Sequence, residues 1–163
     1  MEANKNNISV RSVKDFFRTD LTPNIGEITV EHRKPSNHEK KSAEFLLKKF
    51  GGIFKFLPGQ GDIGLKTPDV NWSGILLEIK SAKGKSSVDS QIRKALQQVN
   101  NNGVILLDVS ENKKSITQVK KEIINRIRRE TDKKQIENLN LNIIIIKNNI
   151  LLDVLEITKK VKA

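Results

Sequence analysis

Apolar residues spaced three and four positions apart predict the helices of this chain. The clearest helix covers residues 37–50, because Ser36 or Asn37 can cap its start and the pair Gly51-Gly52 can end it. The helix is amphipathic, so one of its sides is expected to pack against a sheet. The same spacing predicts further helices over residues 10–17, 87–101 and 115–130.

Short apolar runs bounded by turn-forming residues predict the strands. Asn148-Asn149 divides the last run into two strands, as a two-residue hairpin turn does. From residue 37 onward the order is α-β-β-β-α-β-α-β-β, which indicates the α/β class, with a sheet flanked by helices. The strands are expected over residues 26–32, 53–57, 67–70, 74–80, 103–109 and, on either side of the Asn148-Asn149 turn, 142–156.

Two charged residues, Glu78 and Lys80, interrupt the apolar strand predicted over residues 74–80. Side chains alternate between the two faces of a strand, so Glu78 and Lys80 share one face. The other face carries only apolar residues. An ordinary buried strand needs no such pair, and the pattern therefore marks a candidate site.

Asp69 is expected to lie near Glu78 on the preceding strand. If residues 71–74 form a four-residue hairpin turn, Val70 lies opposite Ile75. Asp69 and Glu78 are then diagonal neighbours on one face, roughly 7–8 Å apart. A metal ion can bridge two carboxylates at that separation.

Two carboxylates and a lysine in this arrangement favour hydrolysis of a phosphodiester. Asp69 and Glu78 would bind a hard divalent ion such as Mg²⁺, which takes the rest of its ligands from water and substrate phosphate. Lys80 would hold or deprotonate the attacking water, or neutralise charge on the phosphoryl oxygens. The alternative is a surface-facing Glu78–Lys80 ion pair on an edge strand, with Asp69 as a turn residue.

The charge of the chain favours a polyanionic partner. Its 163 residues include 30 basic and 19 acidic ones, a net charge of +11. Nucleic acid is the leading candidate, and solvated lysines that keep the protein soluble are the alternative. Because the sequence contains no cysteine and no long apolar run, we expect neither disulfides nor a membrane span.

The residues Pro68-Asp69 and Glu78-x-Lys80 resemble the signature of PD-(D/E)XK nucleases, the restriction-endonuclease-like fold with a mixed central sheet flanked by helices. A longer resemblance, over about residues 35–155, is to the C-terminal transfer-RNA-cleaving toxin domain of contact-dependent growth inhibition proteins. We therefore expect an N-terminal segment at residues 1–34 and a nuclease toxin domain at 35–163. The stretches that carry this longer resemblance are 37–52, 57–70, 76–84, 92–98 and 104–110.

This resemblance implies further site residues. Glu39 lies on the inward side of the helix 37–50 and would complete the catalytic set of Asp69, Glu78 and Lys80. A capping box with Ser36 is the alternative role of Glu39. Gln98 is implied to touch the site or the substrate, although a solvated glutamine fits equally well. Phosphates beside the cleaved bond could be bound by Lys83, Lys85, Arg93 and Lys94, with a solvated surface as the alternative.

The resemblance also implies a biological role. The chain would be a metal-dependent nuclease toxin that cleaves RNA, with transfer RNA expected, using Mg²⁺ or alternatively Mn²⁺ or Zn²⁺. It would be delivered as part of a larger protein into the cytoplasm of a competing bacterial cell, and an acidic immunity protein would inhibit it. Alternatives are a DNase of the same fold, a non-catalytic nucleic-acid-binding module, and a metal-free ribonuclease that uses His32 or His38.

Overall fold

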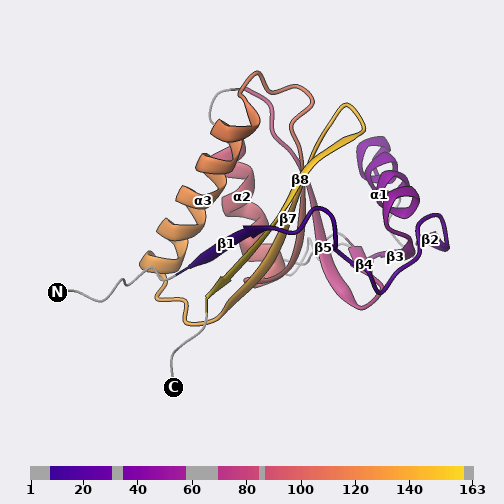
Figure 1. The fold of residues 1–163 in the computed structure, drawn as a ribbon, viewed down its shortest axis with the longest axis horizontal. Helices are drawn as coiled ribbons and strands as arrows, with labels where there is room; N and C mark the ends of the chain where they lie inside the picture. Colours follow the sequence, from indigo (N-terminus) through magenta and orange to yellow (C-terminus); the bar gives the residue numbers. More distant parts are fainter. Residues whose placement is uncertain (1–7, 31–34, 58–69, 85–86, 160–163) are drawn as a thin grey trace, which may run out of the picture.

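The computed structural model describes residues 8–30, 35–57, 70–84 and 87–159. Within these residues, eight strands form one mixed sheet in the order β1-β8-β7-β6-β5-β4-β3-β2 (Figure 1). The strands are β1 (Ser9–Ser12), β2 (Gly26–Val30), β3 (Gly52–Phe56), β4 (Val70–Trp72), β5 (Ile75–Ser81), β6 (Asn102–Asp108), β7 (Leu139–Lys147) and β8 (Ile150–Lys159).

In the described part of the chain, three helices cover the two faces of this sheet. Helices α2 (Ser87–Val99) and α3 (Ile116–Lys133) connect the parallel strands β5, β6 and β7 and lie together on one face. Helix α1 (Asn37–Lys49) connects the parallel strands β2 and β3 and lies on the opposite face (Figure 1). The α/β class and the sheet flanked by helices are therefore confirmed.

The two faces bury different kinds of side chain. The face under α2 and α3, here called the aliphatic face, has a buried core of Ala, Val, Leu and Ile alone, including Ile92, Ile105 and Ile123. The face under α1, here called the aromatic face, buries Phe50, Phe54, Phe56 and Trp72 with aliphatic neighbours.

Trp72 is the centre of the aromatic face. Its ring stacks on Phe54 at a centroid distance of 5.1 Å, and its indole N–H donates a hydrogen bond of 2.9 Å to the Gly51 carbonyl. The Arg18 guanidinium lies 5.0 Å from the indole and donates to the Trp72 carbonyl at 3.3 Å. Ring contacts and a satisfied N–H explain why this large side chain is fully buried.

Most predicted elements agree with the structure, and the cap of α1 is the clearest case. Ser36 Oγ accepts from the Glu39 N–H at 3.1 Å, and Glu39 Oε1 accepts from the Ser36 N–H at 3.0 Å, which completes a capping box. The hairpin turn is also confirmed: Asn148 and Asn149 have φ values of 51° and 61°, as the tight turn between β7 and β8 requires.

The predicted helix over residues 10–17 is wrong. Residues 9–12 form β1, which pairs antiparallel with β8, with Val10 opposite Ile157. Val10 packs against the aliphatic core, and Arg11 bonds Glu156 across the two strands at 2.7 Å. These contacts with a distant part of the chain outweigh a short helical pattern. The segment expected to precede the domain therefore contributes both edge strands, β1 and β2, to the sheet.

The predicted four-residue turn between β4 and β5 is also wrong. The turn consists of Ser73 and Gly74 alone, with φ values of 45° and 91°. Trp72 therefore pairs with Ile75, and Val70 pairs with Leu77. The strand extends because Trp72 belongs to the aromatic core. The predicted strand residues 67–69 lie outside the described part of the chain. No helix in that described part is long and apolar enough to cross a membrane.

Candidate active site

Glu78 and Lys80 lie on β5, which is an internal strand between β4 and β6. Leu77 and Ile79 belong to the aromatic core, so the alternating residues Glu78 and Lys80 project from the aliphatic face. The Glu78 side chain is fully buried, with 0% exposure. The structure thus excludes a surface-facing ion pair on an edge strand.

The Glu78 carboxylate and the Lys80 ammonium form a close charged pair. Glu78 Oε2 lies 3.7 Å from Lys80 Nζ, and the Lys80 side chain keeps 20% of its surface exposed. Burying a carboxylate is costly, and a nearby ammonium offsets part of that cost. The anion of this pair is therefore buried, whereas solvent reaches the cation near the carboxyl end of β5.

The carboxyl ends of parallel strands meet at one edge of the sheet, and a second polar cluster lies there. Asp108 ends β6, opposite Ser81 of β5. Asp108 Oδ2 lies 3.0 Å from His38 Nε2, and Oδ1 accepts from the Ser110 N–H at 2.8 Å and from the Ser110 hydroxyl. Burial alone would raise the pKa of Asp108, but the bonds from His38 and Ser110 outweigh it and hold this pKa below its ordinary value.

Asp108 was not among the site residues that the sequence predicted. It lies on the same face of β6 as Val104 and Leu106, which is the aromatic face and the side of α1. An acidic residue at the end of a buried parallel strand is a recognisable signal, because ligands of open α/β sheets bind at these strand ends. His38, whose side chain is partly exposed, is tied to this strand end by its contact with Asp108.

Glu39 is not brought together with Glu78. Its carboxylate caps α1, the helix that covers the aromatic face, whereas Glu78 projects from the aliphatic face. The alternative role of Glu39 as part of a capping box is therefore the one that the structure displays. Its catalytic role stays a prediction from the resemblance.

The predicted substrate-binding residues have mixed environments. Lys83 Nζ pairs with Glu111 Oε2 at 3.2 Å on the exposed surface. Arg93 and Lys94 are exposed on α2, and Gln98 is half-buried on the same helix, with its Oε1 atom enclosed by the protein. The fifth predicted substrate-binding residue, Lys85, lies outside the described residues, as does the predicted metal ligand Asp69.

A shallow hollow of about 420 Å³ lies on β3 and β4, beside β5. Ile53 and Lys55 alternate with the aromatic-face residues of β3, so they project from the same face of the sheet as Glu78. Asn71 of β4 does the same and pairs with Leu76. Sequence reasoning missed Lys55 and Asn71, although the alternation of β3 could have placed Lys55.

The donors at this site fit a hard divalent cation in part. Glu78 supplies one buried carboxylate, and Mg²⁺ binds through one or two carboxylates together with water and substrate phosphate. Among the described residues, no three His, Cys, Asp or Glu side chains lie close enough together to hold an ion. The second expected ligand, Asp69, is not among those residues.

Comparisons of the chain with protein-family models, with curated proteins and with solved structures give no match.

Proposed function

We propose that the chain is a metal-dependent nuclease that hydrolyses phosphodiester bonds of RNA, with transfer RNA as the expected substrate. The observation that carries this proposal is the Glu78–Lys80 pair, a fully buried carboxylate 3.7 Å from an ammonium on an internal strand. The resemblance to PD-(D/E)XK nucleases and the net charge of +11 support it.

Stability alone does not account for this pair. Replacing a buried ion pair by apolar residues of similar size is often neutral or stabilising. The neighbouring strand β6 fills the equivalent positions with Ile105 and Leu107, which lie opposite Glu78 and Lys80. An aliphatic pair would therefore fit β5, and the charged pair is better explained by chemistry.

Asp69 and Glu78 would hold the ion, with Mg²⁺ favoured over Mn²⁺ and Zn²⁺. A bound divalent ion supplies a Lewis acid for the phosphoryl oxygen and lowers the pKa of a water molecule. Lys80 would stabilise the negative charge that grows on the phosphoryl group, or hold the attacking water. Lys55, on the same face, would contact a neighbouring phosphate.

The toxin role rests on the resemblance alone. In that role the chain is part of a larger delivered protein and acts in the cytoplasm of a competing bacterial cell. A cognate acidic immunity protein would associate quickly with a protein of net charge +11, since opposite charges steer their encounter.

The test is cleavage of total transfer RNA and of plasmid DNA by the full chain, with Mg²⁺ and with EDTA. We expect cleavage of transfer RNA that requires Mg²⁺ and that Glu78→Gln reduces by at least about 100-fold. Glu156→Gln is the matched control, because Glu156 is also a strand glutamate paired with a cation but lies on β8. Equal activity of both variants and the parent would refute the proposed site.

The His38–Asp108 pair supports a second candidate, a metal-free ribonuclease. A histidine held by a carboxylate can act as general base toward the RNA 2′-hydroxyl. That enzyme would be insensitive to EDTA, would leave cyclic phosphate ends and would lose activity in His38→Ala. Cleavage of plasmid alone would instead identify a DNase, and no cleavage of either substrate would favour a binding module.

A further inference from the structure

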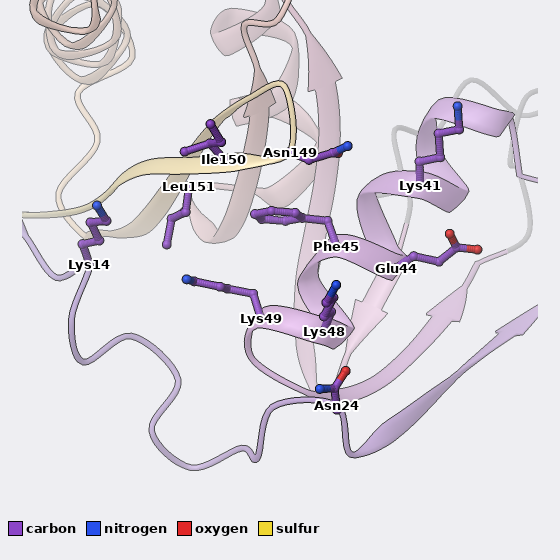
Figure 2. A pocket seen from close by; sticks show the side chains of 10 residues that line it. All are labelled: Lys14, Asn24, Lys41, Glu44, Phe45, Lys48, Lys49, Asn149, Ile150 and Leu151. Atoms are coloured by element: carbon purple, nitrogen blue, oxygen red, sulfur yellow. The ribbon is translucent and has the colours of Figure 1, made fainter.

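A groove separates α1 from the tip of the β7–β8 hairpin, on the aromatic face of the sheet (Figure 2). Its volume is about 820 Å³. One wall is α1, the other wall is Asn149, Ile150 and Leu151 of the hairpin, and the segment before β2 adds Lys14 and Asn24. This α1–hairpin groove contains none of the residues of the candidate active site.

The groove is strongly cationic. Four lysines line it, Lys14, Lys41, Lys48 and Lys49, against one carboxylate, Glu44. Within the described residues, none of the four lysines forms an ion pair, and Figure 2 shows Glu44 extending away from the hairpin. The positive charge is therefore available to an anionic ligand.

An apolar gap lies between the lysines. Figure 2 shows the Phe45 ring extending from α1 toward Ile150 and Leu151 of the hairpin. Phe45 is half-buried, and Ile150 is 62% exposed, so its apolar surface is open to a ligand. An aromatic ring opposite an aliphatic side chain is an arrangement that proteins use to enclose an unstacked nucleobase.

The order of residues along α1 also fits a nucleotide. Lys41, Phe45 and Lys49 are spaced four residues apart, so they lie along one side of the helix. The two lysines are separated by eight residues, about 12 Å along the helix axis, with the ring between them. A cation, a ring and a second cation in a row suit a phosphate, a base and a second phosphate of a single strand.

We infer that the α1–hairpin groove binds an unpaired nucleotide of a polynucleotide. Its base would insert between Phe45 and Ile150, and the flanking phosphates would contact Lys41 and Lys49. The side-chain amide of Asn149 would be able to bond the edge of the base. The volume lies within the range of pockets that hold ligands of nucleotide size.

An acidic protein segment is the competing occupant, but it explains less. Such a segment would use the lysines and would also bury Ile150, yet it has no need for a ring placed between two cations. The inference rests on the proposed function only in naming RNA as the polynucleotide. The groove lies on the opposite face of the sheet from Glu78, so it would be a second contact with the substrate rather than part of the cleavage site.

The test measures binding of a fluorescein-labelled single-stranded oligoribonucleotide to the full chain in EDTA, where metal-dependent cleavage is absent. Phe45→Leu keeps an apolar side chain in the core but removes the ring. We expect it to weaken binding about tenfold, the effect of losing one stacked base. Phe16→Leu, at an exposed phenylalanine outside the groove, should bind like the parent. Ile150→Ala, at an exposed position that costs little packing, should also weaken binding.

The lysines are tested by a charge-matched pair of triple variants. Substituting Lys41, Lys48 and Lys49 by alanine should lower the slope of log affinity against log salt by about 1.4, at about 0.7 for each of the phosphate contacts of Lys41 and Lys49. Substituting Lys40, Lys121 and Lys133, which are exposed outside the groove, removes the same charge and should change the slope far less.

Equal losses in both triple variants would overturn the inference, because binding would then follow overall charge. Unchanged binding in Phe45→Leu and Ile150→Ala would overturn it as well, as would equal affinity for a fully paired RNA duplex. The outcome is separable from that of the proposed function. RNA binding that depends on the groove, without Mg²⁺-dependent cleavage, would refute the metal-dependent nuclease and support the groove site. Mg²⁺-dependent cleavage by a chain whose groove variants bind RNA normally would support the nuclease and refute the groove site.

Discussion

The buried Arg18 on one face of the sheet and the Glu78–Lys80 pair on the other have different surroundings. On the aromatic face, the buried Arg18 guanidinium is accounted for by structural contacts with the Trp72 ring, the Trp72 carbonyl and Asp20. On the aliphatic face, Glu78 and Lys80 stand among Ala, Val, Leu and Ile side chains. The first charge helps to assemble a core, and the second is placed where an aliphatic residue would serve the core equally well. The comparison favours a structural role for Arg18 and a chemical role for the Glu78–Lys80 pair.

The largest effect is expected on the aromatic face. Trp72→Ala removes the side chain at the centre of its ring cluster and leaves a cavity, which should lower the free energy of unfolding by about 3–5 kcal/mol. Urea denaturation followed by circular dichroism measures this. A loss below about 1 kcal/mol would show that the aromatic face does not dominate stability.

On the aliphatic face we expect the opposite result, a loss of activity with little change in stability. The double variant Glu78→Leu, Lys80→Met replaces the charged pair by apolar side chains of similar size, and should unfold with a free energy within about 1 kcal/mol of the parent or above it. Its cleavage of transfer RNA should be lost. Lys80→Ala alone should be less stable than the double variant, because it leaves the Glu78 carboxylate buried without its ammonium. A double variant with a much lower free energy of unfolding but normal cleavage would show that the Glu78–Lys80 pair has a structural role.

A pH prediction concerns the edge where the two faces meet. The pKa of Asp108 is below its ordinary value of 3.8 in the folded protein, so the folded state binds this proton less readily than the unfolded chain. Its contribution to stability is present above that ordinary value and is lost as the pH falls through the lower, folded pKa. Asp108→Asn should cost about 1–2 kcal/mol at pH 7, because the hydrogen bonds with His38 and with the Ser110 N–H and hydroxyl are weakened, and should flatten the fall in stability below pH 4. Urea denaturation at a series of pH values gives both quantities, and an unchanged acid profile would contradict the prediction.

The smallest effect is expected at the surface. Lys83 and Glu111 form an exposed ion pair, so Lys83→Ala should change the free energy of unfolding by less than about 0.5 kcal/mol. If Lys83 binds phosphate, KM for transfer RNA should rise about threefold with kcat unchanged. Steady-state kinetics decide this, and an unchanged KM would leave Lys83 a solvated surface residue. Lys40→Ala, on an exposed part of α1, is the control.

Local signals made much of the fold predictable. Ser36 and Glu39 mark the start of α1, Gly51 follows its end, and the Asn148-Asn149 pair specifies its own turn. The alternation in β5 was enough to place Glu78 and Lys80 on one face, because strand periodicity needs no knowledge of the partner strands. Features that depend only on residues close in sequence, such as a helix cap or the alternation of side chains along a strand, could thus be predicted from the chain.

Features that depend on distant residues were not predictable in the same way. β1 pairs with residues about 145 positions away, so nothing in its own pattern separates it from a short helix. His38 and Asp108 are 70 residues apart, and only the fold brings them to 3.0 Å. Asn71 resembled a turn residue, yet the burial of Trp72 extended the strand through it. The local pattern of the groove lysines predicts no site, because only the fold places the hairpin opposite them.

The position of β1 and β2 at the two edges of the sheet has a consequence for how the chain folds. Both strands lie within the first 30 residues, yet β1 pairs with β8, which is the last of these eight strands along the chain. An early part of the chain must therefore wait until almost all of the rest is available before its pairing is complete. Until then β8 has an unpaired edge that can recruit a strand from another molecule. Such long-range closure is slow, and the period before it is complete is when aggregation competes with folding.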